Sequence, residues 1–175
     1  MLIHPKNTRA KDLIDMLSRD GARIHFGQFA EDAFILQRFR GKRGGFYVDC
    51  GAHHPTRYSN TFLLHRVFGW SGVNIDVDAR AIEAFERERP KDANVQSGLS
   101  DSEGQAELAL FRDGAVNTLV GAVAATTDAK FGPLGKENVP VRPLRALLAE
   151  HVHESLAVDY MNVDRDGLDL PVLKG

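Results

Sequence analysis

The apolar residues of this chain recur with two different periods. Helical spacing predicts helices at residues 12–19, 31–40, 79–89 and 143–151. It predicts one more helix that Ser59 would cap and that Gly69 would end. Short apolar or alternating runs predict strands at residues 46–50, 72–77, 94–99, 105–111, 139–141 and 156–163. Residues 113–137 show little periodicity and predict a long connection. Strands that alternate with helices are typical of an α/β fold with a mostly parallel sheet and flanking helices.

Length and composition favour one globular domain. The 175 residues can bury a core, and 43% hydrophobic against 26% charged residues argues against disorder. We expect residues 1–44 to form a helical cover and residues 45–175 the α/β core. A net charge of -2 gives no reason to expect a nucleic-acid partner. The first 20 residues are broken by charges, so we expect no signal peptide or membrane span and a cytoplasmic protein.

The cysteine and histidine content limits the chemistry. Cys50 is the single cysteine, which excludes an internal disulfide and a multi-cysteine zinc site. It is either a reactive thiol or a small buried residue at a strand end. His53 and His54 are adjacent, and adjacent side chains in an extended segment diverge. We therefore expect no metal site.

Acidic residues follow the predicted strands. Asp49 and Gly51 end the strand at 46–50, and Asp76, which ends the next strand, lies 25 residues beyond Gly51. A glycine there lets a ligand approach the backbone, and the second carboxylate can accept hydrogen bonds from ribose hydroxyls. Asp101 follows the third strand and either reaches an adenine amino group or serves as a turn residue. No G-x-G-x-x-G motif is present, which disfavours a dinucleotide pyrophosphate.

An ordered series of motifs extends from Gly27 to the last residue. It comprises Gln28-x-x-Glu31-Asp32, Gly45-Phe-Tyr-Val-Asp-Cys-Gly-Ala-His-His-Pro55, Ser59-Asn60-Thr61, Gly69-Trp-x-Gly-Val-Asn-Ile-Asp76, Asn117-Thr118 and Asp164-x-Asp166-Gly167-Leu-Asp169. This series resembles the FkbM family of S-adenosylmethionine-dependent methyltransferases. The resemblance implies a Rossmann-like class I methyltransferase fold, S-adenosyl-L-methionine as cofactor, and methyl transfer, usually to an oxygen nucleophile.

The resemblance also implies roles for individual residues. Asp49 and Gly51 would line the methionine end of the cofactor, Asp76 would hold the ribose, and Asp101 would lie near adenine. Asp164 would face the methionine and methyl region. Other residues that match family motifs around the same cleft are Gln28, Glu31, Asn60 and Thr61.

A hydroxyl acceptor benefits from a general base, and two residues are candidates for it. An imidazole titrates near neutral pH, so His53 is the first candidate, although a structural role in the loop is equally compatible with its position. Asp164 is the second candidate. The acceptor would be a small molecule, a glycan or a lipid-linked intermediate.

Two other function classes stay open at this point. A non-catalytic cofactor-binding or interaction domain is the first alternative, and a nicotinamide-dependent oxidoreductase is the second. In the family the sheet continues after the segment that matches residues 168–175, so we expect a fold truncated on its C-terminal side. The exposed edge of the strand at 156–163 would then be covered by a missing C-terminal segment or by another copy in a homo-oligomer.

Overall fold

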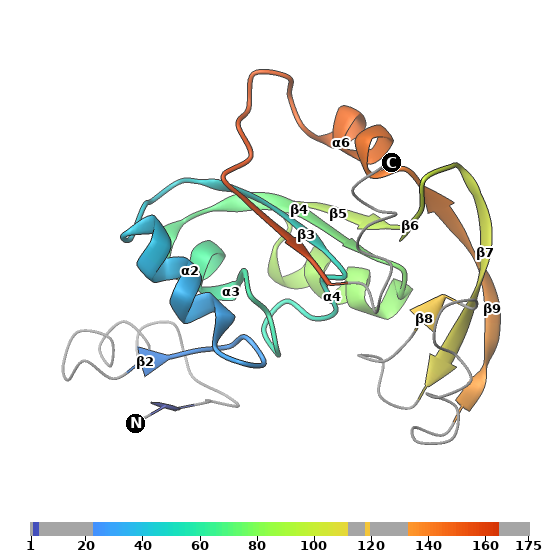
Figure 1. Ribbon diagram of the computed structural model, residues 1–175, viewed down its shortest axis with the longest axis horizontal. Helices are drawn as coiled ribbons and strands as arrows, with labels where there is room; N and C mark the ends of the chain where they lie inside the picture. Colours follow the sequence, from blue (N-terminus) through green and yellow to red (C-terminus); the bar gives the residue numbers. More distant parts are fainter. Residues whose placement is uncertain (1, 4–22, 112–117, 120–132, 165–175) are drawn as a thin grey trace.

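The computed structural model describes residues 2–3, 23–111, 118–119 and 133–164, and these form an α/β structure (Figure 1). The helix expected at residues 12–19 lies outside the described residues, as does most of the connection expected at 113–137. Two short strands, β1 (Leu2–Ile3) and β2 (Arg23–Ile24), pair in parallel.

Four parallel strands form the central sheet, in the order β10-β3-β4-β5. They are β3 (Phe46–Cys50), β4 (Ser71–Asp76), β5 (Ala93–Gln96) and β10 (Tyr160–Val163). In the register, Asp49 lies between Asn74 of β4 and Asn162 of β10. Because the strands are parallel, their carboxyl ends meet at one edge, where open α/β sheets bind their ligands. The predicted parallel sheet is confirmed.

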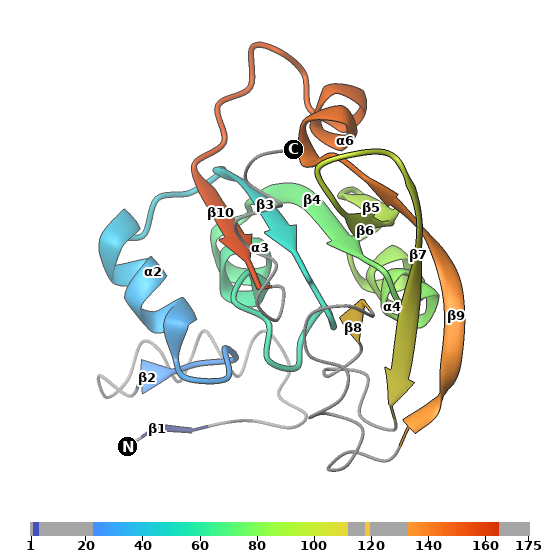
Figure 2. The same cartoon turned by 45° about the vertical axis from the view of Figure 1, so that its right-hand side comes forward.

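Helices cover both faces of this sheet (Figure 2). On one face lie α2 (Glu31–Phe39), α3 (Phe62–Phe68) and α4 (Ala79–Glu88), and on the other lies α6 (Leu144–His151). Side chains that alternate along a strand point to opposite faces. Val48 and Cys50 accordingly pack with Leu147 of α6, whereas Tyr47 packs with Leu64 of α3. Cys50 is therefore a buried core residue, as one of the two interpretations of its position expected.

A second, mixed sheet lies beside the first, in the order β6-β9-β7-β8. Its strands are β6 (Gly98–Leu99), β7 (Gly104–Phe111), β8 (Thr118–Leu119) and β9 (Pro133–Arg142). The antiparallel pair β7 and β9 makes most of it, and Leu108, Val139 and Val141 pack there with Val77, which follows β4. The expected extended arm at 105–111 is thus one strand of this sheet.

Part of the expected long connection was interpreted wrongly. Residues 133–138 belong to β9, which continues through the short strand predicted at 139–141. Leu134 to Asn138 are exposed and show no clear apolar alternation, so their own sequence carries no strand signal. Pairing with β7 creates this half of the strand, and Lys136 Nζ lies 2.7 Å from the Glu107 carboxylate across the pair.

Two predicted strands have different bounds. The strand expected at 94–99 is divided at Ser97, whose backbone N–H donates to the carbonyl of Asp76 at 3.0 Å, and its two parts pair in different sheets. The strand expected at 156–163 begins only at Tyr160, because its partner β3 begins at Phe46 and earlier residues have no strand beside them. In the described part of the chain β10 pairs with β3 alone, and the expected covering of its other edge stays a prediction.

The predicted N-cap of α3 was also wrong. The capping position is Thr61, without a capping side-chain hydrogen bond, and Ser59 is buried. The Ser59 hydroxyl accepts a hydrogen bond from Arg89 at 3.0 Å, so Ser59 makes a tertiary contact instead of capping the helix. At α4, by contrast, the Asp78 side chain caps the helix by accepting from the N–H of Arg80 at 2.9 Å.

Candidate functional site

Asp76 joins two turns at the carboxyl-end edge of the central sheet. One carboxylate oxygen accepts from the backbone N–H of His53 at 2.8 Å, and the other accepts from the N–H of Asp78 at 2.8 Å. The residue is half-buried. A carboxylate has about four lone-pair directions and can accept more than one hydrogen bond on each oxygen.

Gly51 makes the turn that brings His53 to Asp76. Its φ is 79°, in the left-handed region that favours glycine, and its N–H donates to the carbonyl of Ile75 at 2.9 Å. The N–H of Ala52 donates to the same carbonyl at 3.1 Å. The end of β3 is therefore bonded to the end of β4, and the structure brings Gly51, His53 and Asp76 together at this edge.

His53 lies on the loop that follows this turn, with its backbone also in the left-handed region at φ 54°. Its Nε2 lies 3.2 Å from the guanidinium of Arg57, and its ring stacks on Tyr58 with 6.5 Å between centroids. Arginine can only donate, so in this geometry Nε2 accepts and the ring proton of a neutral imidazole is on Nδ1. To act as a base through Nε2, His53 would have to release the Arg57 guanidinium, so that Nε2 can take the proton of the acceptor hydroxyl.

His54 has a structural task in the same loop. Its Nδ1 accepts from the backbone N–H groups of Thr56 and Arg57, both at 3.0 Å. Burial lowers the pKa of His54 and favours the neutral ring that these bonds require. Its Nδ1 is thus engaged in shaping the loop.

Asp49 lies on the sheet face that α3 covers, and it is buried. Its two oxygens accept from the amide of Asn162 at 2.9 Å and from the hydroxyl of Thr61 at 2.8 Å. Burial raises the pKa of the Asp49 carboxyl, while those two hydrogen bonds and the charge of Arg89 act to lower it. Asp49 and Thr61, both predicted for the cofactor site, therefore contact each other directly.

Asn60 extends this line of contacts toward the start of α2. Its amide donates to Asn162 Oδ1 at 3.4 Å. Among the described residues its Oδ1 is a buried acceptor without a hydrogen-bond donor. A Cβ added to Gly27 would lie 2.5 Å from this oxygen and 2.7 Å from the Glu31 carboxylate, so glycine is required for the close approach. Glu31 itself accepts from the N–H of Phe29 at 2.9 Å.

Three predicted site residues are exposed. Gln28 lies in the turn before α2, and Asp164 follows β10, where its N–H donates to the carbonyl of Cys50 at 3.0 Å. Asp164 is therefore next to the Gly51 turn. Asp101 lies in the turn before β7, where the hydroxyls of Ser100 and Ser102 donate to it at 3.5 and 3.2 Å. A turn position was one of the two interpretations of Asp101, and its contact with adenine stays a prediction.

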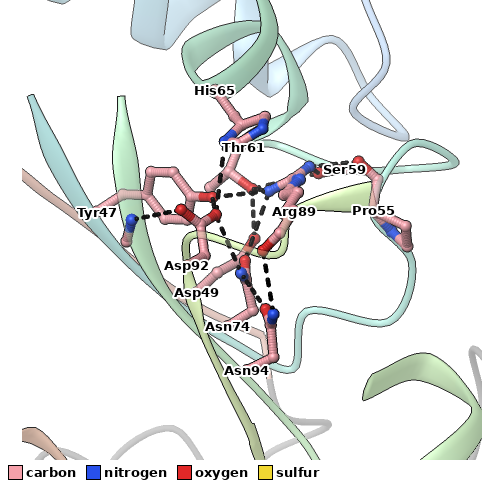
Figure 3. Close-up of polar contacts among 11 residues, drawn as sticks. Tyr47, Asp49, Pro55, Ser59, Thr61, His65, Asn74, Arg89, Asp92 and Asn94 are labelled. Atoms are coloured by element: carbon pink, nitrogen blue, oxygen red, sulfur yellow. Dashed lines mark hydrogen bonds and ion pairs between the residues drawn. The ribbon is translucent and has the colours of Figure 1, made fainter. Parts of the chain in front are cut away.

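Behind this edge lies a group of buried polar residues, of which the sequence interpretation singled out only Asp49 and Thr61 as site residues (Figure 3). We call it the Arg89 cluster; its members are Tyr47, Asp49, Ser59, Thr61, Asn74, Arg89 and Asp92. Asn74 is the one signal in the sequence, because a buried amide in an otherwise apolar strand requires polar partners. Its side chain donates to Asn94 at 2.9 Å and to Asp92 at 3.4 Å.

Within the part of the chain that the structure describes, no group of three or more histidine, cysteine or acidic residues could hold a metal ion. No described helix is long and apolar enough to cross a membrane.

Comparison with known proteins adds one finding. A family model described as the methyltransferase FkbM domain matches residues 49–175. The matched segment begins at Asp49 and includes Gly51, Asp76 and Asp164. No curated protein matches the chain, and no solved structure matches it.

Proposed function

Because the chain belongs to the FkbM methyltransferase family, we propose that it binds S-adenosyl-L-methionine and methylates a hydroxyl oxygen. The order β5-β4-β3-β10 of the parallel sheet is compatible with a Rossmann-like class I methyltransferase fold, which we propose for the core. The acceptor is proposed to be a small molecule, a glycan or a lipid-linked intermediate.

The observation that carries this proposal is the carboxylate of Asp76 at the end of β4. It is fixed by the backbone of His53 and Asp78, beside the glycine turn that ends β3. The two oxygens of a carboxylate can accept from two vicinal hydroxyls, and its charge strengthens such hydrogen bonds. We therefore assign the ribose of the cofactor to Asp76.

The other residues at this edge fit a cationic cofactor. Asn60 offers a buried acceptor that no described residue donates to, and Asp49 and Glu31 supply negative charge nearby. We assign Asp49 and Gly51 to the methionine end and Asp101 to the adenine. We place four residues around the same site: Gln28, Glu31, Asn60 and Thr61. Both oxygens of Asp49 already accept hydrogen bonds, so Asp49 would act mainly through its charge.

Methyl transfer to a hydroxyl requires the protein to position the acceptor and to remove its hydroxyl proton. When bound, the cofactor supplies an electrophilic methyl group on a positively charged sulfur. An in-line displacement forms the oxygen–methyl bond and breaks the sulfur–methyl bond, so holding the acceptor in contact supplies much of the rate. His53 Nε2 is the proposed acceptor of the hydroxyl proton, and Asp164, next to the Gly51 turn, is the second candidate.

A turnover assay tests this function. The protein is incubated with cofactor that carries a labelled methyl group and with panels of hydroxyl-bearing small molecules, glycans and lipid-linked sugars. We expect label to enter an ether or ester of one panel, with one S-adenosylhomocysteine formed per methyl transferred. Transfer to nitrogen or carbon acceptors alone would contradict the oxygen assignment, and cofactor binding without any transfer would favour a non-catalytic domain.

A further inference from the structure

Arg89 directly follows α4, and its side chain turns inward. It is the only buried cationic side chain in the part of the chain that the structure describes. A buried guanidinium is costly unless its donors are satisfied and its charge is compensated. Arg89 meets both conditions in the cluster shown in Figure 3.

The two terminal nitrogens of Arg89 reach two different parts of the protein. Nη1 donates to the Tyr47 hydroxyl at 2.9 Å on the sheet and to the Thr61 hydroxyl at 2.9 Å. Nη2 donates to the carbonyl of Pro55 and to the Ser59 hydroxyl at 3.0 Å. Pro55, Ser59 and Thr61 all belong to the loop between β3 and α3, so most of these bonds hold that loop.

The charge of Arg89 is compensated through two shared hydroxyl groups. Arginine only donates and an ionised carboxylate only accepts, so a hydroxyl between them has one possible orientation. Thr61 accepts from Arg89 and donates to Asp49 at 2.8 Å. Tyr47 accepts from Arg89 and donates to Asp92 at 2.5 Å. Burial raises the pKa of the Tyr47 phenol and keeps this donor protonated.

The loop that Arg89 holds is also the loop that carries His53. Residues 51–61 contain no helix or regular strand, and both His53 and Tyr58 have positive φ values, of 54° and 58°. Such backbone conformations persist only where the surroundings enforce them. On the outer side Asp76 binds the N–H of His53 at 2.8 Å, and on the inner side Arg89 binds the loop farther along.

We propose that Arg89 is a positioning residue of the methyltransferase site: it fixes the β3–α3 loop and orients the Thr61 hydroxyl toward Asp49. This inference rests on the proposed function. Arg89 touches neither of the residues proposed for ribose binding and proton transfer, and it acts on them through the loop. A lysine could not replace it, because a single ammonium cannot span the sheet side and the loop side at once.

The test separates the loop-side contacts from the sheet-side contacts. Ser59→Ala removes one loop-side acceptor, Arg89→Lys removes the planar fork, and Tyr47→Phe removes the sheet-side acceptor without touching the loop. For each variant we would measure the melting temperature, hydrogen exchange of the backbone amides at residues 53, 54, 56 and 57, and kcat and KM for the cofactor. Should Tyr47→Phe not fold, Ile82→Val, a core truncation on α4, replaces it as the destabilised control.

The expected results differ in kind between the two sides. Ser59→Ala and Arg89→Lys should speed exchange of the loop amides by about tenfold or more and raise the cofactor KM by about 3–10-fold. Tyr47→Phe should lower the melting temperature but change loop exchange and KM by less than about twofold. If exchange and KM instead change in every variant in proportion to its loss of melting temperature, Arg89 has only a structural role and the inference is overturned.

The loop measurement does not depend on the proposed reaction. If the parent protein binds no S-adenosylhomocysteine, the proposed function fails, and the exchange comparison between Ser59→Ala and Tyr47→Phe alone decides whether Arg89 fixes the loop. If the parent binds it and the loop amides of Ser59→Ala and Arg89→Lys exchange as in the parent, the inference fails while the proposed function stands.

Discussion

The carboxyl-end edge of the central sheet and the Arg89 cluster both gather acidic side chains, but different groups satisfy them. At the edge, the half-buried Asp76 accepts from two backbone N–H groups. In the cluster, the buried Asp49 and Asp92 accept mainly from hydroxyl and amide side chains, several of which also bond to Arg89, and Asp92 accepts in addition from the N–H of Gly72. Changes of Asp76 and His53 at the edge should therefore act directly on binding and turnover, whereas changes of Arg89 in the cluster should lower stability and act on binding only through the β3–α3 loop.

The largest effect is expected for the proposed base at the edge. His53→Ala should lower turnover by roughly 10²–10⁴-fold and leave cofactor affinity nearly intact, because a general base acts on the acceptor proton. Steady-state kinetics and calorimetric titration of the same variant measure the two quantities. Arg57→Ala, which removes the guanidinium beside Nε2 and over the Tyr58 ring but keeps the imidazole, is the matched control and should lose much less turnover.

Two outcomes would move the assignment of the base. An equal loss of cofactor affinity in His53→Ala would make His53 a structural or cofactor contact. A turnover defect found only in Asp164→Asn would transfer the role to Asp164.

The next largest effect belongs to the cluster. Arg89→Met should lower the free energy of unfolding by about 3–5 kcal/mol, because it leaves buried carboxylates without their compensating charge. Urea unfolding measures this loss. Arg87→Met changes an exposed arginine on the same helix and should stay within about 0.5 kcal/mol of the parent. A loss below about 1 kcal/mol in Arg89→Met would show that the charges of the cluster are compensated in another way.

At the edge, Asp76→Ala should weaken S-adenosylhomocysteine binding by about 1–3 kcal/mol, the scale of charge-assisted hydrogen bonds to hydroxyls. Asp76→Asn keeps an acceptor but loses the charge, so its loss should be intermediate. Calorimetric titration of both variants, with melting temperatures as the folding control, tests the assignment. An unchanged affinity in folded Asp76→Ala protein would remove Asp76 from the cofactor site.

The smallest effect concerns Asp78, a carboxylate of the edge with a structural task. Asp78→Ala should cost about 1 kcal/mol of stability at neutral pH, since the side chain caps α4. Asp78→Asn preserves a capping oxygen and is the matched control. Urea unfolding across the acidic pH range gives the measurement.

The pH dependence of this effect has a definite sign. Partial burial acts to raise the pKa of Asp78, but hydrogen bonds from the side chain and the N–H of Arg80 outweigh it and hold that pKa below its ordinary value. The charged carboxylate therefore stabilises the fold above the ordinary carboxyl pKa, and this contribution is lost as the pH falls through the lowered value. The difference between the parent and Asp78→Ala should shrink on acidification; a constant difference would contradict this.

The central sheet could be predicted because the sequence of each of its main strands carries a recognisable strand pattern. β3 and β4 are short apolar runs with a carboxylate at or next to their ends, and helical spacing marks α3 between them and α4 after β4. β9 could not be predicted in full, since Gly135 to Asn138 become a strand only by pairing with β7. Local pattern fails where the partner strand supplies the reason for the conformation.

The candidate site could be predicted only in part for a similar reason. Asp76 and Gly51 lie at strand ends, a position that the chain order reveals. Arg89 stands beside Pro90 at the end of a helix with a charged outer face, where an arginine is ordinarily exposed. Arg89 is buried because Tyr47, Thr61 and Asp92, which come from segments distant in the sequence, form its polar surroundings. The residues next to Arg89 in the sequence do not indicate these contacts.

Calorimetric titration of the parent protein with S-adenosylhomocysteine and with NAD tests the central claim most directly. A methyltransferase site with Asp76 on the ribose and no phosphate-binding glycines should bind S-adenosylhomocysteine and leave NAD unbound. Binding of NAD, or no binding of S-adenosylhomocysteine by the folded protein, would contradict the account.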